Sequence, residues 1–425
     1  MSVRNILKSL QSHAAVFSNK SFWAFFGTGL IVSVAYMDPG NWGTSISAGA
    51  QHNFDLLWVV WMASGMAMLF QYLSGKMGIA GHGLADVIRL RWKNKAAVLA
   101  YWLLAEIAVL ATDLAEFLGI AVALNLLFGI PLLPAALIAM LDVGLLVVLT
   151  RKSFRPLEYA FILFVSVIGL GYVYELFITK PDVAEVLAHS VTPILGADTI
   201  LLAVGIIGAT VMPHALFVHS WLLKNKAKQF ARTLSKADML TFHIADNVFS
   251  LIIAGFINAA ILIMAAAAFY QSGLGVATID EAYRTLAPLF GEFSATVFGI
   301  ALLAAGISSS ITGTLAGQSI MESLTDFRLS LLARRLITRV INVIPLLVAI
   351  FLNIEPLDIM VQSQVALSLL IPLPLLPLIY YSADQRIMGR LANHRLTTAV
   401  AALFALVILA FNAYLLADTF GFLAG

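Results

Sequence analysis

The sequence predicts an all-α membrane protein with eleven transmembrane helices. Hydrophobic residues make up 61% of the 425 residues and charged residues only 11%, whereas a soluble domain has about 25% charged residues. The apolar residues also gather in stretches that are long enough for a helix to cross a bilayer, which takes about 20 residues. This composition excludes an ordinary soluble enzyme and a disordered chain.

Eleven stretches are candidate spans, and several of them are interrupted or unusually long. They cover approximately residues 22–50, 56–76, 97–127, 130–149, 156–178, 198–223, 239–270, 286–322, 335–353, 357–381 and 397–418. The segments between them are too short for a separate soluble domain.

The basic residues orient these spans. With a cytoplasmic N-terminus, 23 of the 25 Lys and Arg residues fall in cytoplasmic segments, and only Lys180 and Arg284 lie outside. Cytoplasmic loops carry such an excess, and a wrong helix count would mix the two sets. We therefore expect a multi-pass protein of the plasma membrane, a bacterial inner membrane, with an outside C-terminus.

Two spans contain residues that interrupt a helix. The first span carries Tyr36-Met37-Asp38-Pro39-Gly40-Asn41, and the sixth carries Gly208-Ala209-Thr210-Val211-Met212-Pro213-His214. Proline removes a backbone donor, and such breaks persist in lipid only around a buried or wet cavity. Breaks in spans one and six predict two inverted five-helix repeats with a binding site between them.

This symmetry divides the chain into four parts. A cytoplasmic N-terminal segment covers residues 1–20, and the first repeat covers 21–178. The second repeat covers 198–381, and residues 382–425 hold the eleventh span and the C-terminus.

The two breaks carry donors suited to a cation. Asp38 lies in mid-membrane, where an ionised carboxylate is costly and is usually functional. Asn41 adds an amide oxygen, Pro213 frees the carbonyl of Ala209, and Met212 adds a thioether. Oxygen donors suit hard ions and sulfur suits softer ones, so the set favours Mn²⁺, Fe²⁺, Co²⁺ or Cd²⁺ over Mg²⁺. Met212 taken alone is also compatible with simple helix packing.

Span three carries three acids on one helical face. Glu106, Asp113 and Glu116 are separated by seven and three residues, which aligns them along the helix. They form either a proton route or a structural ion-pair network with Arg334 or Arg335. Metal binding requires the carboxylate form of Asp38 and so releases a proton, which such a route could carry to the cytoplasm.

Other polar or helix-breaking residues allow two interpretations each. His214 is either a proton relay or a structural hydrogen-bonding group, and His219 is interpreted as structural. Asp142 and Asp246 are interpreted mainly as structural or inner-gate residues. Pro372, Pro374 and Pro377 predict a kinked span ten or, as the alternative, a flexible gate.

The motifs Asp38-Pro39-Gly40-Asn41 and Met212-Pro213-His214 resemble those of the natural resistance-associated macrophage protein (Nramp) family. Ala111-Thr112-Asp113-Leu114-Ala115-Glu116-Phe117 and Gly313-Thr314-Leu315-Ala316-Gly317-Gln318 are similar to further family motifs. The resemblance extends from about residue 25 to 415 and is strongest to the bacterial manganese-transporter branch. It implies the leucine-transporter (LeuT) fold and proton-coupled transport of divalent metals by alternating access.

The resemblance also implies roles for single residues. Asp38, Asn41, Met212 and the Ala209 carbonyl would bind the metal, and Gln364 would join them when the site is occluded. Protons would start from Asp38 and His214 and pass Asp113, Glu116 and Arg335. Trp42 and Gly43 depart from the Phe and Ala that are common in the family, and the bulkier indole is expected to reshape the outer vestibule.

Other function classes fit less well. A sodium-coupled amino-acid or small-solute symporter of the same fold is the main alternative, but a central acid such as Asp38 would repel a substrate carboxylate. An ion channel would need rings of ligands from several chains, and the sequence lacks the HExxH and GxSxG motifs of enzymes. We expect no cofactor, because the metal is the substrate, and no nucleic-acid partner. An oligomer is not required.

Overall fold

The computed structural model describes residues 19–142, 144, 155–271, 273, 279–325, 327 and 329–422. Within these residues the secondary structure is helical, and none of them forms a β-strand. Most of the predicted N-terminal segment (1–20), and residues 143 and 145–149 of the predicted fourth span (130–149), lie outside the described residues.

Seven long helices form most of the bundle. They are α5 (Leu57–Ala80), α7 (Lys95–Phe128), α10 (Arg155–Thr179), α14 (Lys236–Ala265), α16 (Glu292–Leu324), α17 (Leu331–Leu352) and α21 (Arg395–Thr419). Shorter helices lie between them as parts of interrupted spans: α2 (Lys20–Phe25), α3 (Thr28–Ala35), α4 (Pro39–His52), α8 (Leu132–Ala139), α12 (Ile200–Val211), α13 (Pro213–Phe230), α18 (Pro356–Leu370) and α19 (Pro372–Ala383).

The remaining elements connect the spans or extend them. They are α6 (Leu84–Arg91), α11 (Val183–Val191), α15 (Ile279–Phe290), α20 (Gln385–Met388), a π-helical turn η1 (Ala266–Tyr270) and a 3₁₀ turn η2 (Gly389–Leu391).

Nine helical segments of the described part are long and apolar enough to cross a membrane. The predicted first and fourth spans are not among them. The first is divided into α2, α3 and α4, and the fourth is described only to Asp142 and at Gly144. The structure therefore supports a multi-pass helical membrane protein, whereas the count of eleven stays a prediction.

The predicted start of the eighth span at residue 286 is wrong. α15 ends at Phe290, and α16 begins only at Glu292. Gly291 separates the two helices with φ 93°, a left-handed conformation that glycine adopts without the steric cost of a side chain. Hydropathy alone did not locate this turn, because a single charged residue, Glu292, stands beside Gly291 in an otherwise mostly apolar stretch.

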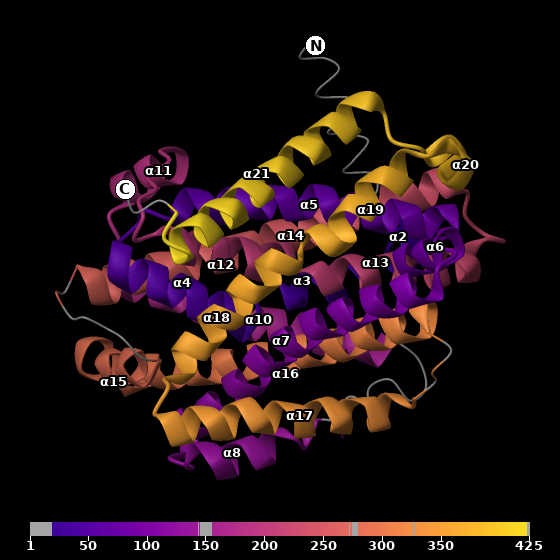
Figure 1. Ribbon diagram of the computed structural model, residues 1–425. Helices are drawn as coiled ribbons and strands as arrows, with labels where there is room; N and C mark the ends of the chain where they lie inside the picture. The colour runs from indigo at the N-terminus through magenta and orange to yellow at the C-terminus, as the bar shows by residue number, and fades with distance from the viewer. Residues whose placement is uncertain are drawn as a thin grey trace.

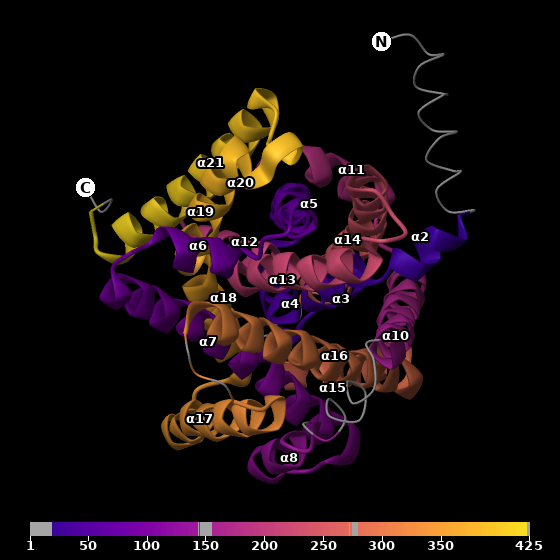
Figure 2. The ribbon, with the colours of Figure 1, turned by 90° about the vertical axis from the view of Figure 1, so that its right-hand side faces the viewer.

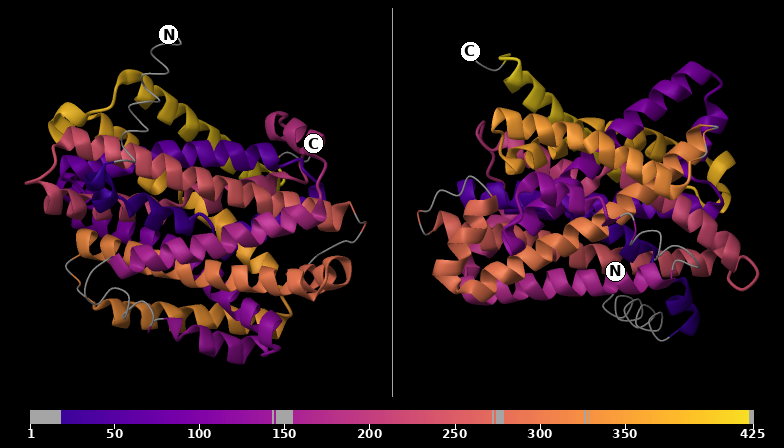
Figure 3. Two further views of the ribbon diagram at one scale, coloured as in Figure 1. Left: turned by 180° about the vertical axis from the view of Figure 1, so that it is seen from behind. Right: turned by 90° about the horizontal axis from the view of Figure 1, so that it is seen from below.

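The interrupted helices lie at the centre of the molecule. In Figure 1 the long helices run across the view, with α6 and α20 at one end of the bundle and α11 and α15 at the other. Figure 2 looks along the bundle and shows α3, α4, α12 and α13 surrounded by the other helices. α8 and α17 lie together at one edge, and α19 to α21 lie at another, as the further views in Figure 3 also show. This arrangement surrounds both helix breaks with protein.

Close backbone packing brings α18 against the broken helices. A Cβ atom on Gly208 of α12 would lie 1.9 Å from the backbone oxygen of Gln364. A Cβ atom on Gly40 of α4 would lie 2.0 Å from the side-chain nitrogen of the same glutamine. Glycine at both positions therefore lets Gln364 approach the two breaks.

Candidate metal centre

The break in the first span lies between α3 and α4. α3 ends at Ala35, α4 begins at Pro39, and Asp38 is the N-cap residue between them. The Asp38 Oδ1 atom accepts a hydrogen bond of 2.9 Å from the backbone N–H of Asn41, and Pro39 suits the first helical position because it needs no backbone donor there. The predicted break is confirmed, and it holds a fully buried carboxyl group.

The break in the sixth span is a single residue, Met212, between α12 and α13. Its φ of 44° is a sparsely populated value for a residue with a side chain, and such strain persists only where the surrounding structure enforces it. Pro213 has no N–H, so the carbonyl of Ala209, four residues earlier, has no helical donor. This break is also confirmed, and it frees the carbonyl that the sequence indicated.

The side chain of Asn41 joins the two breaks. Its Nδ2 atom donates to Asp38 Oδ1 at 2.9 Å and to the Ala209 carbonyl at 2.8 Å. The amide nitrogen therefore lies between two oxygens that a cation would also bridge. Asn41 and Ala209 are 168 residues apart in the sequence. Their contact brings a carboxylate of span one and a carbonyl of span six to the same place.

Gln364 of α18 lies at the same point. The Cβ position of Gly40 is close both to the Gln364 side chain and, at 2.8 Å, to Asp38 Oδ2. Among the described residues, neither Asp38 Oδ2 nor Gln364 Oε1 has a hydrogen-bond partner, although both atoms are buried. The Gln364 atom nearest the Gly40 position is the amide nitrogen. Leaving buried acceptors without a partner costs free energy, so Asp38 Oδ2 and Gln364 Oε1 are both candidate ligands for a cation.

Thr210 and Asn258 contact the side-chain oxygen of Asn41. Thr210 Oγ1 donates to Asn41 Oδ1 at 3.2 Å, and Asn258 Nδ2 lies 3.4 Å from the same oxygen. Asn258 of α14 also donates to the Tyr36 carbonyl at 2.7 Å, which ties the first break to the seventh span. The role of Thr210 was missed by sequence reasoning, because only the fold shows which threonine hydroxyl faces the site.

The donors combine one acid with neutral groups. In the described part of the chain, no group of three or more His, Asp or Glu side chains is arranged to hold a metal ion. The C-terminal ends of α3 and α12 meet near Asp38 and Met212, and helix C-termini carry partial negative charge that favours a cation. The centre can hold a divalent ion without fixing it as tightly as a cluster of acids would.

His214 connects the centre to α7. Its Nδ1 atom lies 3.1 Å from Thr112 Oγ1, and its Nε2 atom is buried without a partner among the described groups. Thr112 directly precedes Asp113 on α7. The geometry is compatible with both interpretations of His214, the relay and the structural hydrogen-bonding group.

Glu116 of α7 lies within electrostatic range of Asp38 as well as of Asp113, Arg335 and Arg339. Both of its carboxyl oxygens are buried, and neither has a hydrogen-bond partner within the described chain. The carboxyl group faces α16, where a Cβ atom on Gly313 would lie 3.1 Å from it.

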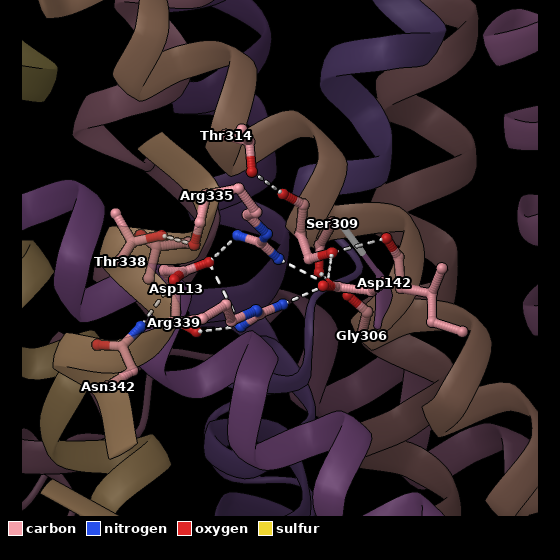
Figure 4. A network of polar contacts seen from close by, with 12 residues as sticks. Asp113, Asp142, Gly306, Ser309, Thr314, Arg335, Thr338, Arg339 and Asn342 are labelled. Atoms are coloured by element: carbon pink, nitrogen blue, oxygen red, sulfur yellow. Dashed lines mark hydrogen bonds and ion pairs between the residues drawn. The ribbon is translucent and has the colours of Figure 1, made fainter. Parts of the chain in front are cut away.

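Asp113 belongs to a four-membered ion-pair network, which Figure 4 shows from close by. Arg335 pairs with Asp113 and, at 2.7 Å, with Asp142; Arg339 also pairs with both acids. Asn342 adds a hydrogen bond of 2.7 Å to Asp113 Oδ2. The two acids and two arginines balance in charge, which leaves Glu116 as the acid of this region without a contacting cation.

The structure also assigns a partner to Glu106, the first acid of α7. Glu106 pairs with Arg334, whose Nη1 atom donates to it at 3.1 Å, and it accepts from Trp102 Nε1 at 2.9 Å. This pair lines a cavity of about 360 Å³ between α7, α16 and α17. Sequence reasoning missed Arg339 and Asn342. They follow Arg335 by four and seven residues and so share its helical face, and this spacing is the signal that could have found them.

Asp246 and His219 support the broken helices elsewhere. The Asp246 Oδ2 atom accepts hydrogen bonds from the backbone N–H groups of Gly27 and Gly29 at 3.1 and 2.8 Å and lies 3.2 Å from Thr28 Oγ1. It therefore fixes the start of α3 to α14. His219 Nδ1 lies 2.8 Å from Gln71 Oε1. Both placements agree with the structural interpretation.

Trp42 does not line an open vestibule in this structure. Its side chain is fully buried, and its ring centroid lies 5.0 Å from that of Tyr172 and 5.4 Å from that of Phe298. The indole packs in the core between α4, α10 and α16. The effect of the indole on the outer vestibule stays a prediction.

The chain is similar in sequence to a known protein family and to members of it. Residues 29–418 match the family described as natural resistance-associated macrophage protein-like. A divalent metal cation transporter MntH from Verminephrobacter eiseniae is 46% identical over 400 residues, which cover 93% of this chain and 90% of the relative.

Two solved structures are similar in fold. A manganese transporter from Eremococcus coleocola superposes with a TM-score of 0.84 at 33% identity, covering 95% of this chain and 89% of the other. Mhp1, a nucleobase-cation-symport-1 family transporter, gives a TM-score of 0.59 at 15% identity over 93% of this chain and 89% of Mhp1. The second similarity concerns the fold alone.

Proposed function

Since the chain belongs to the natural resistance-associated macrophage protein-like family, we propose that it is a secondary transporter that imports divalent transition metals. Its cargo is Mn²⁺ and also Fe²⁺, Co²⁺ and Cd²⁺, carried in symport with protons by alternating access. The metal is cargo rather than a cofactor. The names of the relatives, a divalent metal cation transporter and a manganese transporter, support this cargo class.

One observation carries the proposal: Asp38 Oδ2 and Gln364 Oε1 are buried acceptor oxygens without a partner among the described residues, and both side chains lie against Gly40 at the first break. The two helix breaks supply further donors there. A cation in contact with Asp38, Asn41, the Ala209 carbonyl, Met212 and Gln364 would satisfy them. The same carboxylate opposes a sodium-coupled amino-acid symporter, because it would repel the substrate carboxylate.

The site must change to bind a metal. Asn41 turns its nitrogen toward Asp38 and Ala209 and its oxygen toward Thr210. An amide binds a metal through its oxygen, so its side chain turns over when the ion replaces the bridging nitrogen. Thr210 can accept as well as donate a hydrogen bond, and it can therefore partner the amide in both orientations.

Protons leave along α7 in this proposal. Metal binding requires the carboxylate form of Asp38, and the released proton passes by His214 or directly to Glu116. From Glu116 the proton moves past Asp113 and Arg335 toward Glu106. The pair of Glu106 and Arg334 lines the cavity between α7, α16 and α17, which lies toward the cytoplasm in this proposal. Glu106 and Glu116 are ten residues apart, about 15 Å along a helix, so the route covers roughly half of the hydrocarbon thickness.

The topology is part of the same proposal. The nine apolar helical segments of the described chain, together with the broken first span and the partly described fourth, make eleven. Spans one to five (21–178) and six to ten (198–381) form the inverted repeats. The excess of Lys and Arg supports a cytoplasmic N-terminal segment (1–20), an outside C-terminus and location in the plasma membrane. The site needs residues of one chain only, so the transporter does not require an oligomer.

A transport assay in sealed proteoliposomes tests the function. Mn²⁺ and Cd²⁺ should enter faster than Mg²⁺ and Ca²⁺, and the lumen should acidify as Mn²⁺ enters. Equal uptake of Mg²⁺ and Mn²⁺ would defeat the role given to Met212. Mn²⁺ uptake without acidification would rule out tight proton coupling and leave metal transport intact.

A further inference from the structure

A groove of about 640 Å³ lies between α19 and α21, away from the metal centre. Leu376, Ile379 and Tyr380 line it from α19, and Ala402, Ala405 and Leu409 line it from α21. Figure 1 shows these two helices side by side, joined at one end by α20. The groove is almost wholly apolar in its lining side chains, as a site for an acyl chain would be.

The groove leads to a basic residue at its cytoplasmic end. Thr398, Ala402, Ala405 and Leu409 follow Arg395 at intervals of three, four, three and four residues, which places all five on one face of α21. Arg395 is the first residue of that helix and is exposed. It therefore lies at the end of the helix face that lines the groove.

Two further arginines lie on the connection from α19 to α21. Arg386 in α20 and Arg390 in η2 are exposed. No carboxylate of the described residues pairs with them or with Arg395. The one acid that lines the groove, Asp384, is already engaged, because it caps α20 and lies 3.7 Å from Arg91. The mouth therefore carries positive charge that the protein itself does not neutralise.

We propose that this groove binds an anionic phospholipid of the cytoplasmic leaflet. One acyl chain lies along the apolar faces of α19 and α21, and the phosphate contacts Arg395 and Arg386. Basic pockets between helices on the cytoplasmic side are suited to anionic head groups, and the planar guanidinium group matches phosphate oxygens with paired hydrogen bonds. Tyr380, an exposed aromatic residue of the groove, suits the membrane interface.

The site has a connection to transport. α19 continues α18 through Ile371, and α18 carries Gln364 of the metal centre. A lipid held between α19 and α21 would restrain the cytoplasmic half of span ten. The inference rests on the proposed function only for the cytoplasmic orientation of the segment from 384 to 395.

Native mass spectrometry of the intact, detergent-solubilised protein tests the site with two probes, phosphatidylglycerol and phosphatidylcholine with identical acyl chains. One phosphatidylglycerol should be retained per chain in preference to phosphatidylcholine. Replacing one arginine, in Arg395→Gln or Arg386→Gln, should weaken phosphatidylglycerol binding about fivefold and leave phosphatidylcholine unchanged. Equal retention of both lipids, or no change in either variant, would overturn the proposal.

A matched pair of tryptophan variants tests the groove itself. Ala402→Trp fills it and should abolish retention of the lipid, whereas Ala410→Trp, at an exposed position of α21 outside the groove lining, should not. A dimer that Ala402→Trp disrupts would make a second copy the occupant and overturn the proposal. Mn²⁺ uptake is measured in parallel: a chain that retains phosphatidylglycerol but moves no Mn²⁺ would refute the proposed function and leave the lipid site standing.

Discussion

The Nδ2 atom of Asn41 lies 2.8 Å from the carbonyl oxygen of Ala209, so an amide of the first broken span occupies the position between oxygens where a cation would lie. In the proposed metal site this hydrogen-bond donor must give way to the ion, and this relationship gives the first two predictions.

Asp38→Asn should abolish metal transport. The substitution keeps the size of the side chain but removes the one carboxylate of the centre. We expect Mn²⁺ binding to weaken by at least about tenfold, because loss of a group that only supports a metal ligand already costs that much. Isothermal titration with Mn²⁺ and uptake by proteoliposomes measure the effect. Full uptake by this variant would show that the metal binds elsewhere.

Asn258→Leu should weaken Mn²⁺ binding about tenfold. The variant removes the donor that holds Tyr36 and Asn41, so both would lose their orientation at the centre. Asn412→Leu is the matched control, because Asn412 of α21 bonds only to Ser368 of α18 in the described chain. Equal weakening in both variants would indicate general loosening of the bundle.

Met212→Ala should change selectivity more than it changes overall binding. A thioether favours softer ions, so the affinity for Cd²⁺ and Mn²⁺ should fall more than that for Ca²⁺ and Mg²⁺. Met264→Ala serves as the control for lost packing, since Met264 is a buried methionine of α14 that is not one of the proposed donors. A uniform fall for all four ions would assign Met212 to packing.

Glu116→Gln should separate metal transport from proton transport. In the wild type, uptake should rise as the external solution becomes acidic and fall again when protons compete for Asp38. Because the amide of the variant cannot release a proton, we expect continued Mn²⁺ uptake with little acidification of the lumen and a flatter pH profile. Glu175→Gln, a buried acid of α10 that accepts from Ser294, should keep the wild-type profile.

Asp142→Leu should destabilise the protein by about 3–5 kcal/mol, the range for removing one partner of a buried ion pair. It leaves both Arg335 and Arg339 with Asp113 as the shared acid. Thermal unfolding in detergent measures the loss. The double variant Asp142→Leu/Arg339→Leu should lose less than the sum of the single variants, because the two side chains interact directly; strict additivity would contradict the network.

Sequence reasoning found the parts of this protein that depend on local chemistry. Pro39 and Pro213 determine where their helices break whatever surrounds them, because proline has no N–H to donate. Asp38 was recognisable because an acid is costly in a membrane. The turn at Gly291 escaped prediction, since the single charge of Glu292 did not divide the long apolar stretch around it.

The pairing of distant residues needed the fold. Glu106 with Arg334, and Asp113 with Arg335, were two of several combinations that the sequence allowed. Thr210 is one of many threonines in apolar helices, and only the approach of α12 to α4 shows that its hydroxyl reaches Asn41. Only the fold shows that the indole of Trp42 packs against Tyr172 and Phe298.

The sequence by itself determined that this chain crosses a membrane many times and interrupts two of its helices at an acid, an amide, a freed carbonyl and a thioether. These properties follow from transfer free energies and backbone donors, which act on each residue locally. The tertiary structure alone decided that the Gln364 side chain lies against Gly40 beside Asp38, and that Asp142 and Arg339 close an ion-pair network around Asp113. Contacts between residues hundreds of positions apart depend on how the helices pack, and no local pattern specifies them.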